Sequence, residues 1–355
     1  MRFARHLAII VLVVLLAACA GRQPPSGLVE IAASGEQWTG VAVSHEGRLF
    51  VSYPLWGNMK ASSVREVLPG GTTRPYPDDA WNEWDPSLPP DQHFVCAQSL
   101  FVDADDHLWV LDPANPRFEG VVAGGPKLVE IDLATNQVLR TVGFGPEIAP
   151  PDSYLNDVRV DTARETAYLT DSGAGALVVV DLATGASRRL LENNSSTKAE
   201  DITLTIEGKP WLRPDGTRPQ IHADGLALTA DGEYLYYQAL TGHTLYRIAT
   251  RWLRDETLTP RALGGKVEYV DNLGAADAIL FGPKGNLYLT AIEENGIKQY
   301  TPAGRVRMVA QSPALQWPDS LALGPDGWLY VTTSRIHLGF SGPGPYRLFK
   351  FKPQL

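Results

Sequence analysis

The sequence contains little cysteine, because Cys19 and Cys96 are the only two among its 355 residues. Cys19 ends the N-terminal segment described below, and modification of its thiol would leave Cys96 alone. No disulfide within the mature chain is then expected. Cys96 lies in the apolar stretch FVCAQSLFV, which is typical of a buried strand and of a buried free thiol. The fold therefore depends on a hydrophobic core, which a chain of this length can bury.

Positive charge is also scarce. Lys and Arg number 31 against 40 Asp and Glu, which gives a net charge of −9 and a pI near 5.3. Nucleic-acid-binding domains usually carry a basic surface, so we expect no nucleic acid partner. The sequence also lacks a phosphate-binding loop, a zincin helix and a nucleophile elbow, since neither SHEGR nor DSGAG has the required pattern.

A single long apolar run lies at the N-terminus. The run LAIIVLVVLLAA (Leu7–Ala18) follows a basic start, is too short to span a membrane and ends in LAAC, which resembles a bacterial lipobox. We expect residues 1–18 to be a signal peptide, Cys19 to be lipidated, and residues 19–27 to form a polar tether. The protein would then be attached to the outer or plasma membrane in the cell envelope. An ordinary secretory signal is the alternative.

Six later segments share one pattern. A polar residue precedes alternating apolar residues, a turn and a second apolar run, and each unit carries further strand-like runs. The six units begin at Thr39, Gln98, Asn156, Asp224, Asp277 and Asp319. Four strands per unit and six units predict an all-β fold, a six-bladed β-propeller over residues 28–355.

The last unit has only three strands before the chain ends. The segment LVEIAA (Leu28–Ala33) can supply its fourth strand, which would close the ring and cover two sheet edges. Two insertions interrupt the rhythm of the units. Residues 192–221 lengthen one connection, and IATRWLRDE (Ile248–Glu256) is expected to form a helical turn. Long connections in a compact repeat protein are often functional.

The residue before the inner strand of each blade lies near the mouth of the channel. This places Thr39, Gln98, Asn156, Asp224, Asp277 and Asp319 around one volume. Three carboxylates in such a ring repel, which raises their pKa values unless a cation or protons intervene. Oxygen ligands suit Ca²⁺ or Mg²⁺, but the same ring could hold a protonated amine or supply a general base. Alternatively, each side chain caps a turn.

Other residues near the mouth are candidates for chemistry. His243 and His337, in turns on the same face, could shuttle protons, or they could simply be hydrogen-bonded surface histidines. Trp317 could wall an aromatic ligand or pack in the core. The candidate catalytic residues are therefore Asp224, Asp277, His243 and His337.

Several stretches resemble the yellow/major royal jelly protein family. They include HLWVLD from His107, AYLTDSGAGALVVVDL from Ala167, DGLALTADGEYLYYQALTG from Asp224 and WPDSLALGPDGWLYVTTSRIH from Trp317. The resemblance covers roughly Leu68 to His337 and implies a secreted six-bladed propeller. Members of this family are linked to dopachrome conversion, to binding of small amines in the channel, or to nutrition.

A weaker resemblance is to the gluconolactonase/senescence-marker propellers, which hold a divalent metal on Glu, Asn and Asp residues at the blade mouths. Asp224, Asp277 and Asn156 match three of those positions, which implies a metal site on these residues. Thr39 stands where the family has its glutamate, so one carboxylate of the metal site is missing.

Three kinds of function remain open at this stage. The protein could be an enzyme acting on a small cyclic or aromatic molecule, by tautomerase-like or metal-dependent lactonase-like chemistry. It could be a binding protein for a small cation or amine, or a scaffold that docks another protein. In each case we expect a monomer, and a small-molecule ligand in the first two.

Overall fold

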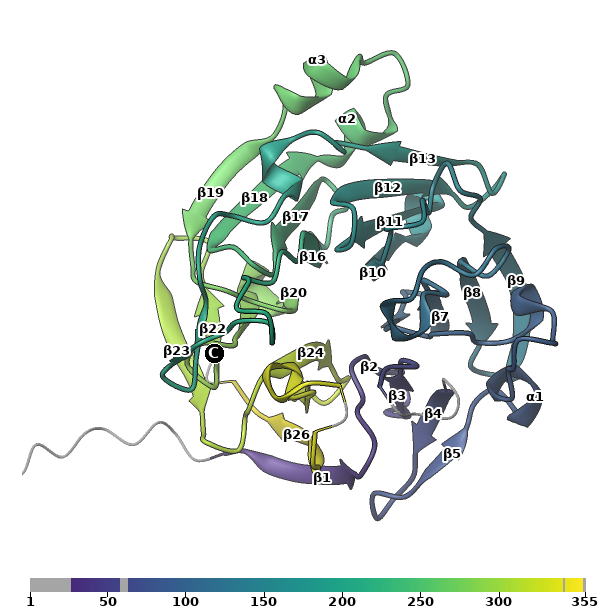
Figure 1. Cartoon of the computed structure of the whole chain (residues 1–355), viewed down its shortest axis with the longest axis vertical. Helices are drawn as coiled ribbons and strands as arrows, with labels where there is room; N and C mark the ends of the chain where they lie inside the picture. The colour runs from purple at the N-terminus through teal and green to yellow at the C-terminus, as the bar shows by residue number, and fades with distance from the viewer. Residues whose placement is uncertain (1–26, 58–62, 341, 354–355) are drawn as a thin grey trace, which may run out of the picture.

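The computed structural model describes residues 27–57, 63–340 and 342–353. The predicted signal peptide, Cys19 and the rest of the tether up to residue 26 lie outside the described residues. Six four-stranded antiparallel sheets surround a central axis (Figure 1). The predicted six-bladed β-propeller is therefore confirmed.

Strand order within each blade follows the chain from the axis outward, except in the last blade. The strands of the first three blades are β2 (Val41–Val43), β3 (Leu49–Tyr53), β4 (Ser63–Val67) and β5 (Thr73–Pro75), then β6 (Ser99–Val102), β7 (His107–Asp112), β8 (Lys127–Asp132) and β9 (Gln137–Gly143), then β10 (Leu155–Asp161), β11 (Thr166–Asp171), β12 (Ala176–Asp181) and β13 (Ser187–Leu190).

Among the other three blades, only the last is completed by the N-terminal strand. Their strands are β16 (Ala223–Leu228), β17 (Tyr234–Ala239), β18 (Thr244–Ala249) and β19 (Glu268–Asn272), then β20 (Ile279–Phe281), β21 (Leu287–Ala291), β22 (Gly296–Tyr300) and β23 (Val306–Gln311), then β24 (Pro318–Leu323), β25 (Leu329–Thr333), β26 (Tyr346–Phe351) and β1 (Val29–Ser34).

The ring is closed by pairing of the two ends of the chain. Strand β1 lies antiparallel to β26, with Ser34 opposite Tyr346 and Val29 opposite Lys350 (Figure 1). The predicted closing strand is confirmed and begins one residue later than expected. Because β1 covers the outer edge of β26, the last blade has the same four strands as its neighbours.

The core lies between neighbouring blades. Every residue of β11, β21 and β25, each the second strand of its blade, is buried, whereas the outermost strand β9 is largely exposed or half-buried. Trp109 and Leu128 of the second blade pack with Val158 and Leu169 of the third. Each blade therefore buries both faces against its neighbours, and its outermost strand is more exposed than its inner ones.

Helical structure is sparse and confined to connections. The short helices are α1 (Asp79–Asn82), α2 (Thr250–Arg254) and α3 (Pro260–Gly264), with 3₁₀ turns η1 (Pro90–Gln92), η2 (Pro116–Phe118), η3 (Thr162–Arg164), η4 (Ser195–Thr197), η5 (Pro283–Gly285) and η6 (Ile336–Leu338). Helix α2 lies within the predicted helical turn. Helix α3 was not predicted, although Thr259 caps it and Pro260 occupies its first position. Among the described residues, no helix is long and apolar enough to cross a membrane.

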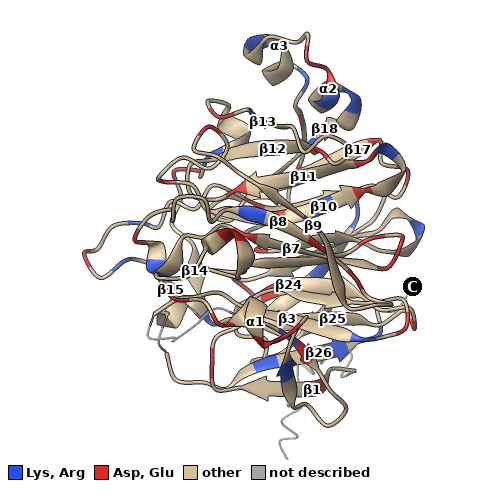
Figure 2. Cartoon of the chain, turned by 90° about the vertical axis from the view of Figure 1, so that its right-hand side faces the viewer, with Lys and Arg blue, Asp and Glu red and all other residues tan. Residues whose placement is uncertain are grey.

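The connection over residues 192–221 forms a small hairpin of its own. Its strands β14 (Thr205–Ile206) and β15 (Lys209–Pro210) pair outside the six blades. Figure 2 shows this hairpin at one face of the propeller, on the left of the view. The insertion noted in the sequence is therefore an ordered element attached to one face of the ring.

Cys96 is buried, as expected, but it precedes its strand. Strand β6 begins only at Ser99, and the segment around Cys96 is held by hydrogen bonds from the Val95 and Cys96 N–H groups to Asp112. Burial raises the pKa of the Cys96 thiol to about 12. The thiol is therefore protonated at neutral pH and is inert as a nucleophile.

Candidate functional site

Neighbouring blades are linked at the channel mouth by side-chain hydroxyl groups. Ser52 of β3 donates to the Gln98 carbonyl at 2.6 Å, and Thr170 of β11 donates to the Asp224 carbonyl at 2.6 Å. Thr332 of β25 donates in the same way to the Thr39 carbonyl. The second strand of one blade thus fixes the backbone of the mouth residue on the next blade.

Three mouth residues lie inside β-bulges. The register of β10 against β11 shifts between Leu155 and Val158, around Asn156. Equivalent shifts occur around Asp224 in β16 and around Asp319 in β24. A bulge changes the direction of the side chains within it, so these three residues leave the regular alternation of their strands.

Five of the six mouth residues line one cavity of about 820 Å³. They are Gln98, Asn156, Asp224, Asp277 and Asp319, all buried. His337 also lines this cavity. The structure therefore brings together most of the predicted site residues, from the second to the sixth blade, in one concave space of the size that small ligands occupy.

The carboxyl groups on the floor of this cavity affect one another. Burial, followed by the charge of Asp319, raises the pKa of Asp224 and of Asp277 well above the usual value. Burial raises the pKa of Asp319 to about 7. The Asp319 Oδ2 atom is buried without a hydrogen-bond partner. At neutral pH the floor therefore retains protons, and it can both accept and donate hydrogen bonds.

A largely buried ion pair lies beside the carboxyl floor, in the inner strand of the third blade. Arg159 Nη1 lies 2.8 Å from Asp157 Oδ1, and its Nη2 donates to the Ile279 carbonyl of the fifth blade at 3.1 Å. The guanidinium also lies 5.5 Å from the centre of the Phe101 ring. Asp157 adds negative charge next to Asp224, which raises the pKa of Asp224 further.

Thr39 and His243 do not contribute to the described lining of the cavity. Thr39 is fully buried, and its hydroxyl lies 3.0 Å from the Gln98 carbonyl oxygen, so it serves the contact between blades. His243 pairs with Glu293 at 2.8 Å, and that hydrogen bond raises the pKa of His243. The contacts with Gln98 and Glu293 explain the positions of these two side chains without a ligand.

Trp317 lies one layer behind the cavity wall. Its indole N–H donates to Asp277 Oδ2 at 2.6 Å, and its ring stacks on His337 with the centroids 5.8 Å apart. Trp211, which does line the cavity, meets Trp317 edge-on at 4.8 Å. Burial lowers the pKa of His337, so its ring is neutral at pH 7. Trp317 thus orients a floor carboxyl group and supports two wall residues.

Four aromatic rings form a wall of the same cavity, and the repeat pattern of the sequence did not predict it. Phe118 stacks on Tyr154 and on Trp56, with centroids 5.0 and 5.6 Å apart, and Phe340 lies 5.0 Å from Phe118. All four rings line the cavity. They come from four separate connections, which lie within the first, second and sixth blades and between the second and third, so no local sequence pattern indicates that they meet. The aromatic residues in these turns were the only available signal.

Tyr154 connects the aromatic wall to the floor. Its hydroxyl accepts from Trp56 Nε1 at 2.8 Å and donates to Gln98 Oε1 at 3.0 Å. Burial raises the pKa of Tyr154 well above its usual value, so the phenol stays protonated. Because Tyr154 holds the amide oxygen of Gln98, the amide nitrogen remains as the group that Gln98 offers to a ligand.

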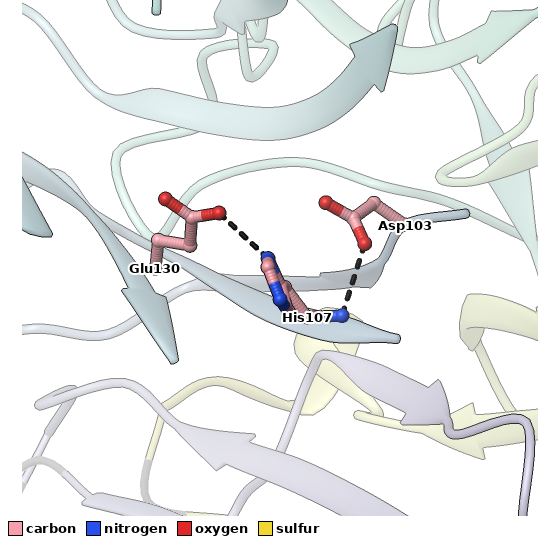
Figure 3. Close-up of side chains that lie close together, drawn as sticks. All are labelled: Asp103, His107 and Glu130. Atoms are coloured by element: carbon pink, nitrogen blue, oxygen red, sulfur yellow. Dashed lines mark hydrogen bonds and ion pairs between the residues drawn. The ribbon is translucent and has the colours of Figure 1, made fainter. Parts of the chain in front are cut away.

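A second cluster with metal-binding residue types lies in the second blade. Asp103, His107 and Glu130 place one ligand atom each within 4.8 Å of one another (Figure 3). These atoms already have partners. Asp103 accepts from His107 N and Trp109 Nε1, and Glu130 accepts from His107 Nδ1 at 2.8 Å and from Arg140. The residue types fit a divalent cation, but Asp103 caps the turn before β7, and Glu130 bonds the side chains of His107 and Arg140.

Comparisons with known proteins agree with this fold. A family profile described as major royal jelly protein matches residues 95–352. Major royal jelly protein 7 of Apis mellifera is 27% identical over 194 residues, which cover 51% of this chain and 40% of that protein. Protein yellow of Drosophila madeirensis is 22% identical over 84% of this chain and 52% of its own length. The chain thus spans about half or less of these relatives.

Solved structures share the propeller as a fold. A gluconolactonase from Xanthomonas campestris has a TM-score of 0.57 and 14% identity, over 92% of this chain and 89% of that one. A luciferin-regenerating enzyme has a TM-score of 0.55 and 13% identity, over 92% and 95% of the two chains. At such low identity these likenesses concern the architecture alone. The family profile covers well over half of the sequence, and the chain therefore belongs to the major royal jelly protein family.

Proposed function

We propose that the protein binds a small aromatic molecule with a basic group in the cavity at the channel mouth. The observation that carries this proposal is the pairing of an aromatic wall with an acidic floor. The stacked rings of Phe118 and Tyr154 line this cavity, and Asp224, Asp277 and Asp319 line it as well. A flat ligand would stack on the wall and place a protonated amine among the carboxyl groups.

The same floor also supports proton transfer to or from a bound ligand. Asp224 and Asp277 are neighbouring carboxyl groups whose pKa values are raised by burial, so one can donate a proton while the other accepts one. A tautomerisation of the kind linked to the yellow family needs a group that donates a proton to the conjugated molecule and a group that accepts one from it. We place this reaction second to binding, because binding needs only the walls and the floor.

Tryptamine is a suitable probe, with tryptophol as its uncharged analogue. We expect the parent protein to bind tryptamine about tenfold more tightly than tryptophol at pH 8, because only the amine gains from the carboxylates. Its affinity should rise between pH 6 and pH 8 as Asp319, with a pKa of about 7, loses its proton. Titration calorimetry at several pH values measures both effects.

Two variants separate the wall from the floor. Phe118→Ala should weaken both ligands equally, since it removes stacking area. Asp319→Asn should weaken tryptamine alone at pH 8 and bring its affinity close to that of tryptophol, because Asp319 is the floor carboxyl group that loses its proton between pH 6 and pH 8. Equal affinity of the parent protein for the two ligands at every pH would contradict the proposal. That result would favour the alternative that the protein is a scaffold that docks another protein.

A divalent cation is the second candidate occupant of the floor. Asn156, Asp224 and Asp277 provide the oxygen donors that Ca²⁺ prefers, and Asp319 holds a buried oxygen without a partner. The gluconolactonase-like fold adds lactone hydrolysis as the matching activity. Against this, Thr39 replaces one carboxylate, and its hydroxyl is engaged by the Gln98 carbonyl. The cation would polarise a carbonyl oxygen of the substrate when bound.

Calcium should raise the unfolding temperature of the parent protein if this site is real, because a ligand that binds only the folded state stabilises it. The rise should shrink in Asp277→Asn and persist in Glu130→Gln, which alters the second-blade cluster instead. If the rise instead persists in Asp277→Asn and shrinks in Glu130→Gln, the cation binds at Asp103, His107 and Glu130. Thermal unfolding with and without millimolar Ca²⁺ distinguishes these outcomes.

We also propose that the protein is anchored to a membrane through a lipid on Cys19. The basic start, the apolar run and the LAAC sequence support this proposal. A Cys19→Ser variant should be released or should remain unprocessed. Fractionation of cells followed by mass measurement of the N-terminus tests it, and a processed variant that stays with membranes would contradict it.

A further inference from the structure

The β14–β15 hairpin forms part of the cavity wall, although it lies outside the six blades. The segment that follows β15 contributes Trp211, Leu212 and Arg213 to the lining, and residues 219–221 add more. The hairpin itself is short, with only two paired residues on each strand. A two-stranded ribbon of this length is not stable by itself in water, so contacts with the propeller must hold it in place.

The turn of this hairpin contains an unusual residue for its conformation. Glu207 and Gly208 connect the two strands and have φ values of 50° and 76°. Two-residue hairpin turns with positive φ at both positions prefer Asn-Gly, Asp-Gly or Gly-Gly. Glutamate in the left-handed region is strained, because its Cβ atom lies too close to the following carbonyl oxygen. A favourable contact of the Glu207 side chain is therefore expected to offset this strain.

The Glu207 carboxylate meets three separate segments of the propeller. Gln316 Nε2 donates to Oε1 at 2.7 Å, and Asn295 Nδ2 donates to the same oxygen at 3.4 Å. His337 Nε2 lies 3.2 Å from Oε2. Asn295 follows β21, Gln316 precedes β24, and His337 follows β25. One side chain of the hairpin therefore bonds to the fifth blade, the sixth blade and the connection between them.

Contacts continue from Glu207 to the floor of the cavity. The His337 ring stacks on Trp317 with an angle of 10° between the planes, and Trp317 donates to Asp277 Oδ2 at 2.6 Å. Trp211, three residues after Gly208, packs its edge against the same Trp317 ring. The hairpin is thus joined to the floor twice, through His337 and through Trp211.

We propose that Glu207 is a positioning residue for the ligand cavity. It fastens the hairpin to the propeller, and by doing so it holds Trp211 and His337 against Trp317 above Asp277. This inference rests on the proposed function, since the cavity that Glu207 shapes is the proposed ligand site. Glu207 itself does not line the described cavity, so its effect on a ligand is transmitted through these rings.

Replacement of Glu207 by asparagine separates this role from that of a simple turn residue. Glu207→Asn creates the Asn-Gly pair that such turns prefer, so a residue serving only the turn would be improved. If Glu207 fastens the hairpin, the variant should instead show faster amide hydrogen exchange over residues 204–211. The near-ultraviolet circular dichroism of the Trp211–Trp317 pair should weaken, and tryptamine should bind about tenfold less tightly.

Two further variants make the comparison specific. Glu207→Gln keeps the length of the side chain and one acceptor oxygen, so it should restore most of the slow exchange. Glu165 also has a positive φ, 47°, and its side chain is exposed in a turn of the third blade. Glu165→Asn is therefore the matched control, and it should leave exchange, dichroism and binding unchanged.

The inference is overturned if Glu207→Asn exchanges as slowly over residues 204–211 as the parent and keeps the tryptophan signal. Urea unfolding verifies that each variant is folded. If the parent does not bind tryptamine, that result counts against the proposed function, while hydrogen exchange and dichroism still decide whether Glu207 holds the hairpin. The two proposals therefore fail in distinguishable ways.

Discussion

Replacing Asp319 by asparagine should stabilise the protein at pH 8 by a few kcal/mol, as judged from a pKa that burial raises from 3.8 to about 7. The folded state holds this proton more tightly than the unfolded state does. The contribution of Asp319 to stability is therefore fully present below pH 4 and is lost as the pH rises towards 7. Asparagine has no proton to lose, so the gain should appear above this range.

Urea unfolding of the parent and Asp319→Asn at pH 4.5 and pH 8 measures this effect. The variant should gain more at pH 8 than at pH 4.5. Asp91→Asn removes one negative charge from an exposed position and controls for net charge alone. If Asp319→Asn changes stability equally at both pH values, the carboxyl cluster is not the source of the pH dependence.

Replacing Gly225 by alanine should destabilise the protein by about 1–3 kcal/mol, because the new methyl group has no room. A Cβ atom at Gly225 would lie 2.7 Å from the Asp277 carbonyl oxygen of the next blade. The contact is with backbone, so relief requires the fourth and fifth blades to move apart at the mouth. Asp277 should move with its backbone, and binding of tryptamine should weaken as well.

Gly143→Ala is the matched control for this prediction. Gly143 also lies in a strand, and a Cβ atom there meets nothing within 4 Å. Alanine at this exposed position should leave stability unchanged or raise it by up to about 1 kcal/mol, since it restricts the unfolded chain. Comparable losses in the two variants would show that the close approach at Gly225 is not the cause.

Much of the fold could be predicted from the sequence because its signals are local and repeated. One pattern recurs six times: a polar residue at the start of the unit, alternating apolar residues and turn residues. Each copy therefore supports the strand assignment of the other five. The closing role of the N-terminal strand follows from counting strands in the last unit. Propeller geometry then places the starting residues at the mouth, and five of the six line the cavity.

The repeated sequence pattern is thus enough to predict the six blades, their closure and the acidic floor, whereas the aromatic wall beside that floor depends on how distant connections meet in space. Phe118 and Phe340 are more than two hundred positions apart in the sequence. They form one wall because the connections that carry them lie side by side on the same face of the propeller. His243 pairs with Glu293 and does not line the cavity, whereas His337 pairs with Glu207 of the hairpin. Such pairings depend on where long connections lie on the closed ring, and no periodic pattern encodes that.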